Sequence, residues 1–168
     1  MTNDKDSEGI PEGYDNREHA YVKHRLLKKY LQTLFLIIGM GPEKSGPIEL
    51  CYVDCFAGPW LDESDKLGTT SIAISLGILE QCQKELRDRG KNIKLRALYV
   101  EKDNDACTRL EQHLARYTPD GIEAKALKGD FVALRDQILD WCGSGSFAFF
   151  FIDPKGWTPV QIDILRAR

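Results

Sequence analysis

The feature that most constrains the fold is a short apolar run that ends in an acidic residue and leads into a turn of small residues. Residues 50–59 have the sequence LCYVDCFAGP, in which Asp54 follows the apolar run. Strands buried on both faces of a sheet are near-continuous apolar runs, and a carboxylate at the end of one needs a partner. In open α/β sheets, ligands bind outside the carboxyl ends of the strands. We therefore predict a strand over 48–56 and a ligand site at the turn that follows it.

Similar apolar runs recur along the chain and alternate with segments of helical periodicity. The expected strands are 48–56, 95–101, 122–128 and 147–152, and the expected helices are 17–39, 70–90, 104–117 and 131–142, with a last helix from Pro159. Such alternation builds βαβ units, whose right-handed crossovers place helices on both faces of a mainly parallel sheet. The predicted fold class is therefore α/β and Rossmann-like.

The length of 168 residues suits one domain with a core of its own. We expect a flexible acidic arm over 1–16, an N-terminal helix and linker over 17–47, and the Rossmann-like domain over 48–168. Sheets of this class usually have more than four strands, so we expect this one to be incomplete at its C-terminal side. The strand at 147–152 would then be an exposed edge.

The charge balance gives little information about partners. A formal net charge of −3 is no global signal for nucleic-acid binding, although a local patch can suffice. The most basic segments are 23–29 and 84–96, which are either solvated surfaces or nucleic-acid contacts, and a protein partner is also left open. The most apolar run, 34–40, is much shorter than the about 20 residues that span a bilayer, so we expect no membrane partner.

The five cysteines are scattered, and no pair has C-x-x-C spacing. None of the three histidines lies near a cysteine at the spacing of metal ligands. We expect reduced, mostly buried thiols in a cytoplasmic protein, and no metal site.

Four acidic residues should project from one edge of the predicted sheet, because each lies at or just after the end of a strand. They are Asp54, Glu101, Asp130 and Asp153. Each has a structural explanation as well: Asp130 can cap the next helix, and Glu101 can pair with Lys102. Together, however, they lie where parallel sheets bind ligands.

The turn after the first strand and the end of the second strand suggest separate contacts to a ligand. Glu101 is placed to accept hydrogen bonds from ribose hydroxyls. The backbone of Phe56, Ala57 and Gly58 can approach a ligand closely, because the last two have little or no side chain. Asp54 can accept a hydrogen bond from an ammonium group or a water molecule.

The third strand end completes this candidate site and limits its ligand. Asp130 offers an acceptor and Phe131 an aromatic face for a purine. The chain has neither a G-x-G-x-x-G nor a G-x-x-x-x-G-K-[ST] motif, and several acids at one edge repel a pyrophosphate. A ligand with hydroxyls and positive charge, such as S-adenosylmethionine, fits better than NAD or ATP.

The order of these motifs carries a family resemblance. The motifs are Asp54-x-Phe56-Ala57-Gly58-Pro59, Glu101, Gly129-Asp130-Phe131 and Asp153-Pro154-x-Gly156, preceded by Lys23-His24 in the first helix. The series resembles class I S-adenosylmethionine-dependent methyltransferases and, more narrowly, the three-Cys-motif partner (TcmP) family. The resemblance implies a methyltransferase-like protein that binds S-adenosylmethionine and acts on nucleic acid or a nucleic-acid-linked target. It also implies that Asp153 and the Pro154 carbonyl position a target amine.

Three departures from the family pattern leave a second function open. Trp60 stands in place of the expected glycine of the turn, Thr69-Thr70 replace a Ser-Pro pair, and Lys155 replaces an aromatic residue. A non-catalytic module of the same fold, which binds a protein or nucleic acid, is the alternative. A nucleotide hydrolase or kinase is a third, which the missing phosphate loop disfavours.

Overall fold

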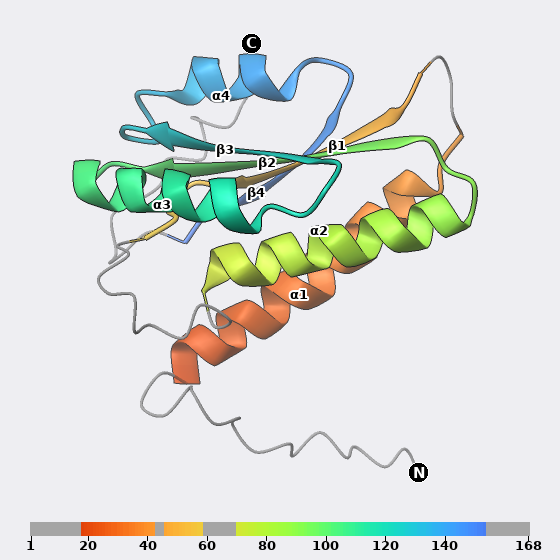
Figure 1. The fold of residues 1–168 in the computed structure, drawn as a ribbon, viewed down its shortest axis with the longest axis horizontal. Coiled ribbons are helices and arrows are strands. Elements are labelled where there is room, and N and C mark those ends of the chain that lie inside the picture. The colour runs from red at the N-terminus through yellow and green to blue at the C-terminus, as the bar shows by residue number, and fades with distance from the viewer. Residues whose placement is uncertain (1–17, 43–45, 59–69, 154–168) are drawn as a thin grey trace.

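The computed structural model describes residues 18–42, 46–58 and 70–153 of the chain, which form an α/β fold around a parallel sheet (Figure 1). The strands are β1 (Ile48–Asp54), β2 (Ile93–Glu101), β3 (Ile122–Lys128) and β4 (Phe147–Phe151). Their order is β3-β2-β1-β4, and all three pairings are parallel. The predicted Rossmann-like class, with a mainly parallel sheet, is confirmed.

Helices cover both faces of the sheet, but unequally. The helices are α1 (Glu18–Gly39), α2 (Ser71–Asp88), α3 (Asn104–Tyr117) and α4 (Arg135–Cys142). The first three lie on one face and α4 lies on the other (Figure 1). The chain moves outward from β1 to β3 and then returns to the far side of β1. Because crossovers are right-handed, this reversal places α4 on the opposite face.

The two faces follow from the two-residue repeat of the strands. Along β1, Leu50 and Tyr52 belong to the core beneath α1, α2 and α3, whereas Cys51 and Val53 belong to the smaller core beneath α4. Both sets are fully buried. β1 is therefore the central element of the fold, covered on both faces and paired on both sides.

The helix α1 attaches to the sheet through one apolar stripe. Leu27, Leu31 and Phe35 are buried, and the ring of Phe35 packs edge-on against Phe147 of β4, with 6.2 Å between the ring centroids. At Gly39 an added Cβ would lie 2.5 Å from a methyl carbon of Leu86. The glycine thus permits close approach of α1 to the C-terminal part of α2.

Several element boundaries differ from the predictions, most clearly at the end of the first strand and at the start of α4. The first strand ends at Asp54 instead of residue 56, because Asp54 Oδ1 accepts a hydrogen bond from Phe56 N and bends the chain. The helix expected from residue 131 begins at Arg135, because Asp130 forms a separate turn, in which its side chain accepts from Val132 N and its carbonyl accepts from Leu134 N. The wholly apolar β4 is half-buried throughout, because among the described strands it lies at the end of the sheet and pairs with β1 alone. Its predicted edge position is confirmed.

Several predictions fall outside the described residues, among them the last helix and Trp60, Pro154 and Lys155. All five cysteines are free and buried, as expected. Among the described helices, none is both long and apolar enough to cross a membrane.

Candidate functional site

The four acidic residues lie at the carboxyl ends of the four strands. Asp54 and Glu101 are the last residues of β1 and β2, Asp130 lies two residues beyond β3, and Asp153 lies two residues beyond β4. The point where the strand order reverses lies between β1 and β4. Open parallel sheets bind ligands outside this point, so Asp54 and Asp153 flank the position that the fold favours for a site.

Asp54 lies beneath the turn and stabilises it. Its carboxyl is fully buried, accepts hydrogen bonds from Ser71 Oγ at 2.8 Å and Phe56 N at 3.1 Å, and lies 3.5 Å from Tyr52 Oη. Burial raises the pKa of this carboxyl to about 6, and the hydrogen bonds from Ser71 and Phe56 oppose the increase. Both oxygens are therefore used within the protein, and Asp54 connects β1 to the first turn of α2.

A buried polar cluster continues below Asp54. Tyr52 and Tyr99, on adjacent strands, pack with their ring centroids 5.9 Å apart, and Ser75 Oγ lies 2.8 Å from Tyr99 Oη. The Ser75 hydroxyl also donates to the Ile72 carbonyl of its own helix, at 3.0 Å. Burial raises the pKa of both tyrosines, so their hydroxyls stay protonated. The cluster fixes the N-terminal half of α2 against the sheet.

The turn after β1 crosses toward β2. Ala57 N donates to the Val100 carbonyl at 3.0 Å, which brings the turn beside the end of β2. Gly58 follows with φ of +80°, a conformation that favours glycine. Among the described residues, an added Cβ at Gly58 would meet the Phe56 carbonyl oxygen alone, at 3.9 Å. The backbone of residues 57 and 58 thus lies beside the end of β2, where its own side chains are only a methyl group and a hydrogen atom.

Glu101, at the end of β2, has hydrogen-bonding capacity that the described residues do not use. Its side chain is 9% exposed, and Oε1 accepts a hydrogen bond from Asp103 N at 2.8 Å. Within the described part of the chain, this is the one hydrogen bond that the Glu101 carboxylate makes. Oε1 is fixed by the start of α3, which leaves Oε2 available to a hydroxyl donor.

Asp130, Phe131 and Phe56 have structural roles in the arrangement. Asp130 is exposed, and its Oδ1 accepts from Val132 N at 2.9 Å and Ala133 N at 3.3 Å. Phe131 is 3% exposed and packs against Phe56, with ring centroids 6.0 Å apart. The Phe131 ring therefore joins the core beneath α4 instead of offering an open face at the sheet edge, whereas Phe56 is half-buried.

Asp153 is engaged by a cation from α1. Lys23 Nζ lies 2.5 Å from Asp153 Oδ1, and the two side chains are 49% and 32% exposed. The ion pair joins residues that are 130 positions apart. It shows that the carboxylate after β4 can accept an ammonium group from the α1 side. Pro154, the other residue assigned to this role, lies outside the described residues.

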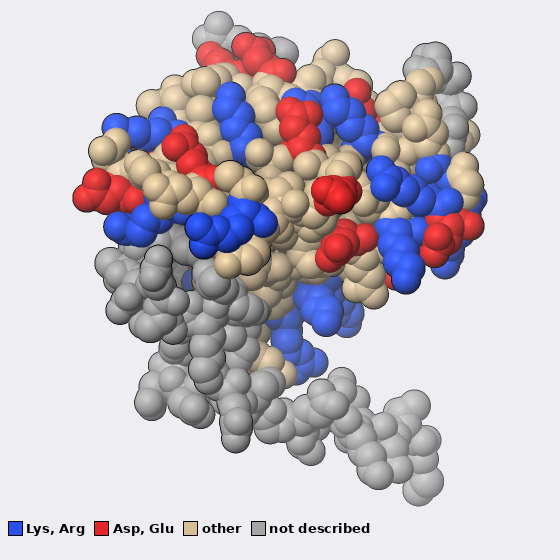
Figure 2. Space-filling model, viewed as in Figure 1, with Lys and Arg blue, Asp and Glu red and all other residues tan. Residues whose placement is uncertain are grey.

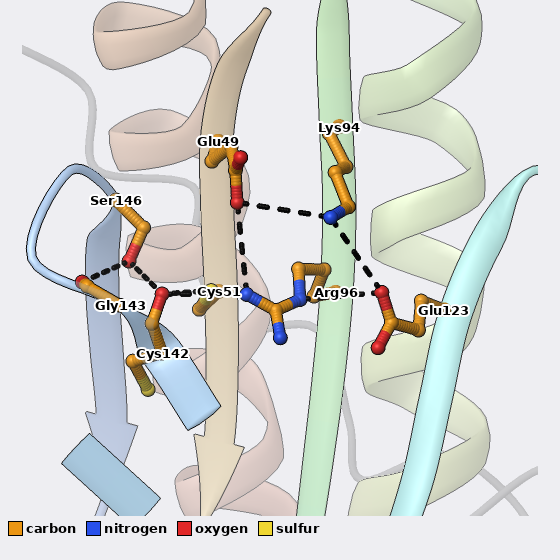
Figure 3. A network of polar contacts seen from close by, with 8 residues as sticks. All are labelled: Glu49, Cys51, Lys94, Arg96, Glu123, Cys142, Gly143 and Ser146. Carbon is orange, nitrogen blue, oxygen red and sulfur yellow. Dashed lines mark hydrogen bonds and ion pairs between the residues drawn. The ribbon is translucent and has the colours of Figure 1, made fainter. Parts of the chain in front are cut away.

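A second polar network, which the sequence analysis missed, crosses the sheet closer to its other end (Figure 3). Arg96 of β2 lies between Glu49 of β1 and Glu123 of β3, with N–O distances of 3.6 and 3.3 Å. Its Nη1 donates to the Cys142 carbonyl at 3.3 Å, and its guanidinium carbon lies 4.0 Å from the centroid of the Trp141 ring. Along β2, the backbone position of Arg96 lies about 17 Å from that of Glu101, so Arg96 is not part of the candidate site.

This network reduces the basic character of the segment 84–96. Lys94 pairs with the same two glutamates, at 3.9 and 3.8 Å, and Lys91 donates to the Gly41 carbonyl at 3.1 Å. Acidic and basic side chains are interspersed over the face drawn in Figure 2. Lys94 and Arg96 are thus neutralised within the sheet, and the remaining cations of the segment lie mainly on the last turns of α2.

Among the described residues, no group of three or more His, Cys, Asp or Glu side chains is arranged to hold a metal ion. Comparison with protein-family models, with curated proteins and with solved structures gives no match for this chain.

Proposed function

We propose that this chain is an S-adenosylmethionine-binding, methyltransferase-like protein of the TcmP type, which acts on nucleic acid or a nucleic-acid-linked target. The observation that carries the proposal is the placement of Glu101 and Asp153 on either side of the turn at residues 55–58. Within the described part of the chain, Oε2 of Glu101 accepts no hydrogen bond, and Asp153 binds the ammonium group of Lys23. Glu101 can therefore accept a hydrogen bond from a ribose hydroxyl, and Asp153 can accept one from a target amine.

Each residue of the site has a separate role in the proposed function. Glu101 Oε2 accepts a hydrogen bond from the ribose, Ala57 and Gly58 allow the ligand to approach the backbone, and Asp54 holds the turn from below. S-adenosylmethionine supplies an electrophilic methyl group when it is bound. Asp153 accepts a hydrogen bond from the target amine, and most of the catalytic effect comes from orientation and from electrostatic placement.

Isothermal titration calorimetry with S-adenosylmethionine tests the cofactor assignment. Glu101→Gln keeps one carbonyl oxygen to accept from Asp103 N but loses the charged acceptor for a hydroxyl. Hydrogen bonds to charged groups contribute about 1.5–3 kcal/mol, so the affinity should fall by about 10- to 100-fold. The matched control is Glu111→Gln, an exposed position on α3, which should bind as the unmodified chain does. No heat of binding from the unmodified chain, or equal affinities in the two variants, would reject the assignment.

The Lys23–Asp153 ion pair favours a second candidate function, a non-catalytic module of the same fold that binds a protein or nucleic acid. If the ammonium of Lys23 stays in place, the acceptor position next to Asp153 is filled by the protein itself. Transfer of a radiolabelled methyl group to cellular DNA, RNA and protein distinguishes the two functions. Incorporation that Asp153→Asn abolishes supports the enzyme, and cofactor binding without incorporation supports the module.

A further inference from the structure

The outward face of α1 carries an apolar stripe that the fold does not use. Five of the eight large apolar side chains that are exposed among the described residues lie on this helix or directly after it. They are Val22, Leu26, Tyr30, Ile37 and Met40, with exposed fractions of 41–62%. The other three are scattered over α3, α4 and the turn before α4.

These five positions form one continuous line. With exposed Thr33, they are spaced by three or four residues from 22 to 40, which is the repeat of one face of a helix. At 100° per residue, the line lies opposite the buried stripe of Leu27, Leu31 and Phe35. The helix α1 therefore has two apolar faces, of which one packs on α2 and the sheet and the other is exposed among the described residues.

The distribution of charge along α1 restricts what can cover the open face. Four cations occur in the first half of the helix, at Lys23, Arg25, Lys28 and Lys29, whereas residues 30–40 have no charged side chain. An anionic lipid surface is bound by cations that accompany the apolar face, and the second half of α1 offers none. The uncharged half is suited to contact with another protein surface.

The stripe on one α1 helix matches the stripe on a second α1 helix that runs in the opposite direction. In an antiparallel pair centred between residues 31 and 32, Leu26 faces Ile37, Tyr30 faces Thr33, and Val22 lies within one residue of the position opposite Met40. Each basic half then lies beside the uncharged half of the other helix and near its C-terminal end, which favours cations. A parallel pair would place the two basic halves side by side. A two-fold symmetric interface requires this kind of self-complementarity.

We propose that α1 is a homodimer interface, in which the stripe of Val22, Leu26, Tyr30, Thr33, Ile37 and Met40 packs antiparallel against the same stripe of a second copy. The occupant of this face is a second copy of the chain. The interface lies on the side of α1 opposite to its contact with the sheet, and it does not depend on the proposed methyltransferase function.

Sedimentation equilibrium of the full chain tests the dimer. Between about 1 and about 200 µM, the mass should rise from the 19.1 kDa of one chain toward twice that value. Ile37→Asp places a charge at a side chain that is 62% exposed in one copy, so folding is retained and the dissociation constant should increase at least about tenfold. The control is Val132→Asp, whose side chain is 51% exposed outside the stripe and which should dimerise normally. A monomer at every concentration, or equal dimerisation of the two variants, overturns the proposal.

Cross-linking tests the orientation independently of affinity. All five native cysteines are buried, so a short bismaleimide reacts selectively with cysteines introduced on the stripe. Leu26→Cys and Ile37→Cys chains should form a covalent dimer when they are mixed and little when each is alone. Cross-links within each variant alone would indicate a parallel pair, and an absence of cross-links in the mixture would indicate no contact; either result overturns the proposal.

Discussion

At the scale of single residues, Asp54 and Asp153 illustrate how similar carboxylates at neighbouring strand ends acquire different chemistry. Asp54 is fully buried and uses its oxygens within the protein, whereas Asp153 is one-third exposed and pairs with an ammonium group. A buried carboxyl must lose its hydration to ionise, and its hydrogen bonds only partly replace that hydration. Asp54 therefore shapes the turn, and Asp153 is accessible to a ligand.

The raised pKa of Asp54 predicts a definite pH dependence of stability. The pKa is 3.8 in the unfolded chain and about 6 in the fold, so the folded state binds the proton more tightly. The stabilisation is fully present below about pH 4 and is lost as the pH rises toward 6; two pKa units correspond to about 3 kcal/mol. Relative to Asp54→Asn, the free energy of unfolding of the unmodified chain should fall by up to this amount over the interval.

Urea unfolding at pH 4, 5, 6 and 7 measures this difference, with Asp105→Asn on the exposed side of α3 as the control. The control should follow the unmodified chain at every pH. A constant difference between Asp54→Asn and the unmodified chain over this pH range would contradict the assignment of the pKa shift to Asp54.

Alanine substitutions at Gly58 and Gly90 separate two effects: the backbone strain that a side chain causes at positive φ, and the loss of contact between the turn and a ligand. Both have positive φ, of 80° and 72°, and a Cβ at either position would meet no atom of the described residues closer than 3.9 Å. Gly58→Ala and Gly90→Ala should therefore each lower the free energy of unfolding by about 1 kcal/mol. Only Gly58→Ala should also weaken S-adenosylmethionine binding, because residue 90 lies at the other end of the sheet.

Calorimetry and urea unfolding of the two glycine variants check both parts. Equal losses of stability with unequal affinities support the approach of the cofactor to the turn. If both variants bind S-adenosylmethionine equally well, the backbone of Gly58 does not contact the cofactor.

At the scale of elements, the sequence predicts those boundaries that depend on local interactions. The start of α3 at Asn104 follows from Asp103, whose side chain accepts from Ala106 N as expected of a helix cap. The predicted start of α4 at residue 131 was wrong, because the residues of the turn that Asp130 forms have a composition that is also typical of a helix. The edge position of β4 was predicted from its place as the last strand and not from its composition, because its wholly apolar sequence is typical of a central strand.

The candidate site shows the same division. The acidic strand ends could be recognised because parallel strands place them at one edge. The burial of Asp54 and Phe131 could not be predicted from the sequence, because it depends on how α2 and the core beneath α4 pack against the sheet. The Arg96 network was missed for a similar reason: its signal is one arginine within an apolar strand, and its partners become neighbours only through the strand register.

The attachment of α1 to the sheet should depend on its apolar stripe much more than on its ion pair. Leu31 is fully buried, so Leu31→Ala should cost about 2–5 kcal/mol of unfolding free energy. The Lys23–Asp153 pair is 49% and 32% exposed, so solvent screens it and Lys23→Gln should cost less than about 1 kcal/mol. Urea unfolding of the two variants measures both values; a larger loss for Lys23→Gln would show that the ion pair holds the helix.

At the scale of the whole molecule, the two faces of the sheet are protected to different degrees. Three helices cover one face, whereas within the described residues only the eight-residue α4 covers the other. Short elements with few buried side chains open at lower free energy than the global core. We therefore expect α4 to detach from the sheet before the rest of the fold unfolds.

The cysteines report on this opening, because they divide between the two cores. Cys51, Cys55 and Cys142 belong to the core between α4 and the sheet, whereas Cys82 and Cys107 belong to the core on the opposite face. In urea below the unfolding transition, the first three should react with iodoacetamide before the last two. Hydrogen bonding with Cys142 and the charge of Arg96 lower the pKa of the Cys51 thiol to about 7, although its burial opposes this. In the native state the Cys51 thiol is buried and the reagent cannot reach it, so Cys51 should react only after α4 opens.

Mass spectrometry of labelled peptides measures the five rates, and Ile138→Ala provides the decisive comparison. Ile138 is the fully buried anchor of α4, so its truncation should favour opening and speed the labelling of Cys51, Cys55 and Cys142. If opening is local, the labelling of Cys82 and Cys107 should remain at the rate of the unmodified chain under the same conditions. Parallel acceleration of all five cysteines would mean that both faces of the sheet unfold together, as a single cooperative unit.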